Sequence, residues 1–163
     1  AFGQGALLAR RLVERGVRYV EVTSSRSWDS MHGGSKNLAN LANELDGTVS
    51  SLMTDLRDRG MLDSTMIVVT SEFGRTPKVK GNGGRDHHPN GFSAMLAGGG
   101  IKGGIAVGET DENGRDPFPE FEPKDLHATI AEALGMTGTK IRRLPGRPSF
   151  LGGKPKPIKE ILA

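Results

Sequence analysis

The sequence predicts an α/β protein with a mainly parallel sheet and helices on both of its faces. A segment with helical spacing, a glycine and then a β-branched segment follow one another twice, at 4–24 and at 37–71. Such alternation is typical of helices packed on a parallel sheet. In addition, the continuous apolar run at 64–71 is typical of a strand that is covered on both faces.

Three segments have the apolar spacing of amphipathic helices, at 4–16, 37–60 and 125–135. Gly16 and Gly60 are the last residues of the first two segments, and a glycine suits the left-handed position that ends a helix. The third begins at an aspartate, Asp125, which we expect to cap it.

The predicted strands are rich in β-branched or apolar residues, at 17–24, 64–71 and 92–100. A short strand and a hairpin turn are expected within 104–118, where Asp-Glu-Asn-Gly is a turn sequence. The segment 144–163 is rich in proline and glycine, so we expect it to be irregular.

Length and composition narrow the class of protein. The 163 residues suggest one domain, 1–163, and the absence of cysteine excludes disulfides and thiolate metal sites. The net charge of +3 favours anionic ligands, but one tryptophan and one tyrosine offer too few stacking platforms for a nucleic-acid binder. No apolar run has the length of a membrane span.

Acidic and imidazole side chains follow the predicted strands. Asp29 and His32 come after 17–24, Glu72 comes after 64–71, and His87 and His88 precede 92–100. In open α/β sheets, ligands bind beyond the carboxyl ends of the strands. Carboxylate oxygens and imidazole nitrogens are ligands for zinc or manganese, so these residues are candidate metal ligands.

Charged neighbours of these candidates suggest further roles. Arg75 and Arg85 could grip an anionic oxygen pair, and Asp86 could support a ligand without touching the metal. Adjacent histidines usually face opposite ways, so at most one of His87 and His88 is expected to be a direct ligand.

Simpler structural explanations remain open at each position. Residues 28–32 could form an ordinary capping loop, and Glu72 could pair with Arg75. The segment 84–89 could be purely structural, and His127, inside an apolar helical pattern, is expected to be a structural histidine. No serine lies in a nucleophile elbow, so no nucleophile is evident.

Several motifs together resemble a known family. "VEVTS…WD…H", "SEFGRTP", "GRDHHP" and "DLHATIAEALGM" occur in the order found in domain-of-unknown-function family 1501. This bacterial family is often labelled sulfatase-like and placed in the alkaline phosphatase superfamily. The resemblance implies an α/β/α sandwich with metal at its strand ends, and hydrolysis of sulfate or phosphate esters by an oxygen nucleophile.

The resemblance also assigns roles to single residues. Glu72 matches a metal-binding aspartate of related enzymes, while Phe73 replaces their histidine, which argues against a second metal. Asp29 and His32 match a tryptophan-aspartate-histidine element, in which two residues here replace the usual single spacer, so His32 is the weaker candidate. His87 or His88 would supply the remaining histidine.

Further implications concern the whole protein. The chain resembles the carboxyl-terminal portion of longer members, which carry the nucleophile nearer their amino terminus and commonly an export leader, implying an extracytoplasmic location. The expected cofactor is zinc or manganese, with calcium and magnesium as further candidates. The expected substrate is a small-molecule or glycan sulfate or phosphate ester. The alternative is an inactive member that binds anionic glycans or serves a surface or secretion complex.

Overall fold

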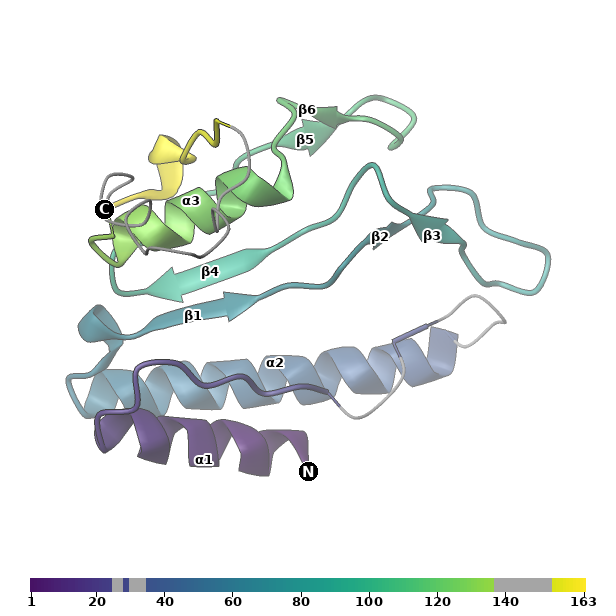
Figure 1. Cartoon of the computed structure of the whole chain (residues 1–163). Coiled ribbons are helices and arrows are strands. Elements are labelled where there is room, and N and C mark those ends of the chain that lie inside the picture. Colours follow the sequence, from purple (N-terminus) through teal and green to yellow (C-terminus); the bar gives the residue numbers. More distant parts are fainter. Residues whose placement is uncertain (25–27, 30–34, 137–153) are drawn as a thin grey trace, which may run out of the picture.

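The computed structural model describes residues 1–24, 28–29, 35–136 and 154–163. Figure 1 shows a layer formed by strands β1 and β4, with helix α2 on one side and helix α3 on the other. The elements of the described chain are α1 (Phe2–Glu14), α2 (Ser35–Asp58), η1 (Leu62–Ser64), β1 (Met66–Val69), β2 (Gly74–Arg75), β3 (His87–His88), β4 (Met95–Gly98), β5 (Glu109–Thr110), β6 (Pro117–Phe118), α3 (Pro123–Ala133) and η2 (Lys159–Ile161).

The three predicted helices are confirmed. Gly16 and Gly60 follow α1 and α2 with φ angles of 89° and 67°, the left-handed region in which glycine is the favoured residue. Gly47 does not interrupt α2, which runs unbroken for 24 residues. Within the described residues, the structure contains no helix with the length and apolarity needed to cross a bilayer, as the sequence predicts.

The strands pair differently from the prediction. β1 is antiparallel to β4, with Met66 opposite Gly98 and Val69 opposite Met95, and every strand pairing in the described chain is antiparallel. A parallel pair needs a long crossover, usually a helix, to return the chain to the same end of the sheet. The connection at 70–94 contains no helix, so the chain reverses direction. That these layers belong to a larger α/β/α sandwich stays a prediction.

The predicted strand at 17–24 is wrong for the described chain. Its backbone pairs with no strand among these residues. Instead it packs on α1, where a Cβ on Gly5 would lie 2.8 Å from Val22 Cγ1. β-Branched composition therefore produced an extended segment here, but a strand also needs a hydrogen-bonded neighbour.

The predicted cover on both faces of 64–71 is also only partly present. The strand itself is confirmed, as β1. Ile67 is buried, whereas Val68 is 37% exposed. Alternate side chains of a strand point to opposite faces, so one face of β1 is covered in this chain and the other is more open.

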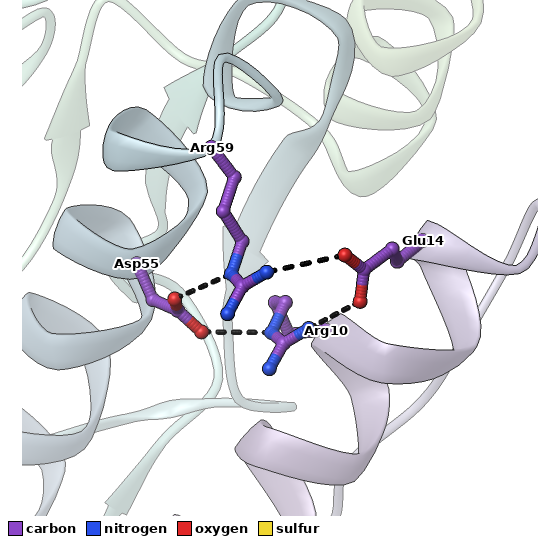
Figure 2. Close-up of polar contacts among 4 residues, drawn as sticks. All are labelled: Arg10, Glu14, Asp55 and Arg59. Carbon is purple, nitrogen blue, oxygen red and sulfur yellow. Dashed lines mark hydrogen bonds and ion pairs between the residues drawn. The ribbon is translucent and has the colours of Figure 1, made fainter.

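Four charged side chains join α1 to α2 (Figure 2). Arg10 Nε donates to Asp55 Oδ2 at 2.7 Å, and Arg10 also pairs with Glu14 on its own helix. Arg59 completes the ring, since its Nε donates to Asp55 Oδ1 at 2.7 Å and its Nη1 contacts Glu14 Oε1 at 3.2 Å. Positive and negative groups therefore alternate around a closed circuit, which we call the α1–α2 ion-pair ring.

The α1–α2 ion-pair ring provides charged partners for Arg10, which the packing of the two helices buries. Arg10 is only 6% exposed, and a buried guanidinium needs charged partners to offset its lost hydration. The pKa of Asp55 is lowered, first by the hydrogen bond from Arg59 and further by the positive charge of Arg10. The same carboxylate raises the pKa of Arg59.

Helix α3 begins one turn earlier than its predicted cap. Glu122 is the N-cap and Asp125 is the third helical residue, whose Oδ2 accepts the Glu122 backbone N–H at 3.0 Å. Asp125 Oδ1 also accepts the backbone N–H of Lys156 at 2.7 Å. Burial acts to raise the pKa of Asp125, but these two N–H groups, together with the positive charges of Lys124 and Lys156, outweigh it and the pKa is lowered.

The end of the proline- and glycine-rich tail is bound to this helix. Thr129 is fully buried, and its Oγ1 accepts the backbone N–H of Ile158 at 2.8 Å. Leu162 forms a bridge with Ile101, and η2 adds a turn of 3-10 helix. The described part of the tail, 154–163, is irregular apart from this turn and bridge, and the rest of it lies outside the described residues.

Arg10→Met should destabilise the fold by about 2 kcal/mol, since it opens the ring and leaves the partly buried Asp55 and Glu14 with Arg59 as their remaining partner in it. The measurement is the free energy of unfolding in urea. Arg57→Met is the matched control, because Arg57 contacts Asp58 at 3.5 Å and both side chains are at least 65% exposed. That control should lose less than about 0.5 kcal/mol, and equal losses for both variants would contradict the importance of the ring.

Asp55→Asn should change how stability depends on pH. Because folding lowers the pKa of Asp55, its carboxylate stabilises the fold above the unfolded-state pKa of about 4, and this contribution is lost as pH falls through the folded-state pKa. The difference in unfolding free energy between wild type and variant should be largest near neutral pH and shrink on acidification. Urea unfolding at about pH 7 and about pH 3 measures it. A difference independent of pH would contradict this prediction.

Candidate functional site

The two polar motifs singled out in the sequence are the two arms of one hairpin. In what we call the β2–β3 hairpin, residues 74–88, Gly74 lies opposite His88 and Arg75 opposite His87. The pairing continues toward the loop, where the Thr76 N–H donates to the Asp86 carbonyl at 3.0 Å. Residues ten or more positions apart in the sequence are therefore direct neighbours.

A close backbone approach requires glycine in β2. A Cβ on Gly74 would lie 2.0 Å from the carbonyl oxygen of Gly91, a distance that no side chain can occupy. The chain that leaves the hairpin therefore lies against Gly74. The glycine holds the hairpin against the segment that leads to β4.

The two adjacent histidines face opposite ways, which confirms the sequence prediction. His87 Nε2 lies 3.4 Å from Asp29 Oδ2. His88 Nε2 lies 2.6 Å from the carbonyl oxygen of Arg115. A carbonyl only accepts, so this nitrogen of His88 carries the proton, and its hydrogen bond leads away from Asp29.

Asp29 lies between His87 and an arginine. Arg75 Nη1 donates to Asp29 Oδ1 at 3.0 Å, and Arg75 Nη2 contacts the Trp28 carbonyl at 3.4 Å. Arg75 therefore pairs with Asp29 and not with Glu72, the partner that the simpler reading of the sequence offered. The Asp29 and His87 side chains are each about 40% exposed, so solvent reaches both.

The described chain brings two of the five candidate metal ligands together. Asp29 and His87 are adjacent, but no three His, Asp or Glu side chains gather as a metal-binding group in the parts of the chain that the structure describes. Glu72 is exposed and forms no hydrogen bond or ion pair with the other described residues. His88 is committed to Arg115, and His32 lies outside the described residues. The ligand roles of Glu72, His32 and His88 stay predictions.

The other charged candidates, Arg85 and Asp86, form contacts within the loop of the hairpin. Arg85 Nη1 donates to the carbonyls of Thr76 and Pro77 at 2.8 and 2.6 Å. Asp86, expected to support a metal ligand, forms an ion pair with Lys80. Both contacts cross the loop from one arm to the other, so they stabilise its conformation.

A second hairpin, formed by β5 and β6, contacts the first. The predicted turn at Asp-Glu-Asn-Gly is confirmed, with Gly114 at a φ of 68°. Asp111 accepts the backbone N–H of Arg115 at 2.5 Å, and this bond is the main reason that its pKa is lowered. A Cβ on Gly114 would lie 3.1 Å from Pro77 Cγ, so the turn rests against the loop of the β2–β3 hairpin.

The sequence interpretation missed the contacts of Phe73. Its ring stacks on His87, with centroids 4.1 Å apart and planes at 27°. Arg75 also lies near this ring, with its Cζ 5.6 Å from the centroid. The period of two along a strand was the available signal, since Phe73 and Arg75 share a face if 73–75 is extended.

The chain's chemistry allows one partial metal site. Two neighbouring ligands of a tetrahedral ion, each about 2.0–2.2 Å from it, lie roughly 3.3–3.6 Å apart. The 3.4 Å between Asp29 Oδ2 and His87 Nε2 falls within that range. The carboxylate and imidazole donors therefore fit two positions of such a site, and a complete site requires more ligands.

Gly74→Ala should disrupt the β2–β3 hairpin, because the new methyl group would overlap the Gly91 carbonyl. We expect a loss of about 1–3 kcal/mol in unfolding free energy, or more if the backbone cannot move. Gly81→Ala is the matched control in the same hairpin, since a Cβ there meets no atom within 4 Å. Urea unfolding measures both, and a Gly74→Ala variant as stable as Gly81→Ala would contradict the close approach.

Comparison with known proteins gives a family but no activity. No curated protein and no solved structure matches the chain. A family model described as "Protein of unknown function (DUF1501)" matches residues 1–162. The match covers the hairpin motifs and nearly the whole sequence, so the chain belongs to the DUF1501 family.

Proposed function

We propose that this chain forms part of a metal-dependent hydrolase of sulfate or phosphate esters. The observation that carries the proposal is the 3.4 Å approach of Asp29 Oδ2 to His87 Nε2. The resemblance of "SEFGRTP" and "GRDHHP" to sulfatase-like proteins supplies the reaction class. Zinc or manganese suits an oxygen and nitrogen donor pair best.

In this proposal, Asp29 and His87 hold the cation, and Glu72 and His32 are candidates for its remaining ligands. A bound divalent cation polarises an ester oxygen and makes water more acidic. Arg75 holds Asp29 through Oδ1, which leaves Oδ2 directed at His87. The carboxylate is thus restrained in one orientation without a metal.

Two arginines would receive the anionic group. Arg75 is half-buried beside Asp29, and in the described structure Arg85 uses only Nη1 for its bonds to backbone carbonyls. Its remaining N–H groups could donate to a sulfate or phosphate oxygen, a contact for which the planar guanidinium is well suited.

The contact between Arg75 and Asp29 also favours a second candidate function. A carboxylate that already has a cationic partner attracts a metal ion less strongly than a free one. A family member of this kind would keep the arginines and bind anionic glycans without turnover. Its binding of sulfated polysaccharide would persist after a chelator had removed all metal.

Zinc binding by the full chain tests the two functions. We expect Zn²⁺ or Mn²⁺ to bind in isothermal titration, and we expect Asp29→Asn and His87→Gln each to weaken binding by more than about 10-fold, because each removes a donor atom. His88→Gln should bind like the wild type, since its ring is directed at Arg115.

Asp63→Asn is the control for the loss of a carboxylate, because Asp63 is exposed on η1. Metal that binds equally well to Asp29→Asn and His87→Gln would reject these ligands. A wild-type chain that binds no metal, yet binds sulfated polysaccharide, would support the second function instead.

A further inference from the structure

Phe73 contacts both groups that meet at Asp29. Its ring stacks on the His87 imidazole at a centroid distance of 4.1 Å, and the Arg75 guanidinium carbon lies 5.6 Å from its centroid. Arg75 and His87 in turn contact different oxygens of the Asp29 carboxylate. One aromatic side chain therefore lies against Arg75 and His87, two partners of the carboxylate.

The register of the hairpin explains this convergence. Arg75 lies opposite His87, and Phe73 precedes Arg75 by two positions. Side chains two apart along an extended segment share a face, and diagonal neighbours across an antiparallel pair are within reach of an aromatic ring. The pairing of β2 with β3 thus places Phe73 beside the imidazole.

The imidazole needs such a restraint. The His87 side chain is 39% exposed, so solvent alone would leave its ring free to rotate about the Cβ–Cγ bond. Rotation moves Nε2 away from Asp29. Planes inclined by only 27° keep the ring nearly parallel to Phe73, which limits that rotation.

We propose that Phe73 is a positioning residue, which holds the imidazole of His87 so that Nε2 and Asp29 Oδ2 face one shared cation. The inference rests on the metal-binding function proposed above. The ring binds no metal itself and acts through His87.

The test compares three variants of the full chain by titration with Zn²⁺ alone. Phe73→Leu removes the flat ring and should weaken Zn²⁺ binding by about 10-fold, the usual size of an effect on ligand orientation. Phe73→Tyr keeps the ring and should bind within about 2-fold of the wild type. Phe118→Leu is the control for loss of a phenylalanine, since Phe118 is 69% exposed on β6, and it should have no effect.

A second readout separates positioning from folding. In the metal-free chain, the Phe73 ring current should shift the NMR signal of the His87 Hε1 proton upfield, and this shift should vanish in Phe73→Leu and persist in Phe73→Tyr. The absorption spectrum of bound Co²⁺ should change in Phe73→Leu as well, because the imidazole approaches the ion at another angle. If Phe73→Leu does not fold, Phe73→Met takes its place.

The outcomes distinguish the inference from the function beneath it. Zn²⁺ binding by the wild type that Phe73→Leu retains in full would overturn the positioning role alone. An unchanged Hε1 shift in Phe73→Leu would do the same. Absence of Zn²⁺, Mn²⁺ and Co²⁺ binding by the wild type would overturn both proposals.

Discussion

The register of β2 against β3 decides which polar groups of this protein meet. With Arg75 opposite His87, one arm of the hairpin provides Phe73 and Arg75, and the other provides the imidazole that faces Asp29. A shift of one residue would direct His88 at this face in place of His87. The close approach of Gly74 to the Gly91 carbonyl opposes such a shift, since only a glycine fits there. The arrangement at Asp29 therefore depends on an uncharged backbone contact between β2 and the segment that follows β3.

Local rules predicted the features that depend on neighbouring residues. The three helices, the glycines after α1 and α2 and the Asp-Glu-Asn-Gly turn follow from spacing and backbone preference alone. The divergence of His87 and His88 follows from the alternation of side chains along a strand. Those predictions required no knowledge of which distant segments come together.

Long-range pairing accounts for what could not be predicted. An extended pattern at 17–24 does not reveal whether a partner strand lies beside it, and the apolar run of β1 does not specify the direction of its neighbour. Arg10 shows the same limit, because its place in an amphipathic helix indicates exposure, while the packing of α2 buries it. The partner of Arg75 also depended on tertiary structure, since Glu72 is near it in sequence and Asp29 is 46 positions away.

Charge balance at Asp29 sets a condition on any cation that binds there. Among the described residues the carboxylate contacts Arg75 and His87, and Arg75 brings a full positive charge to within 3.0 Å of Oδ1. A divalent ion beside Oδ2 would experience repulsion from that guanidinium, reduced by the solvent that reaches a site about 40% exposed. Two donors would rarely suffice against this repulsion, since catalytic zinc sites use three protein ligands. A further anionic donor would offset the charge of Arg75 and would also add a ligand to the ion. A carboxylate such as that of Glu72 would do both. A neutral histidine would add a ligand but would not offset the charge.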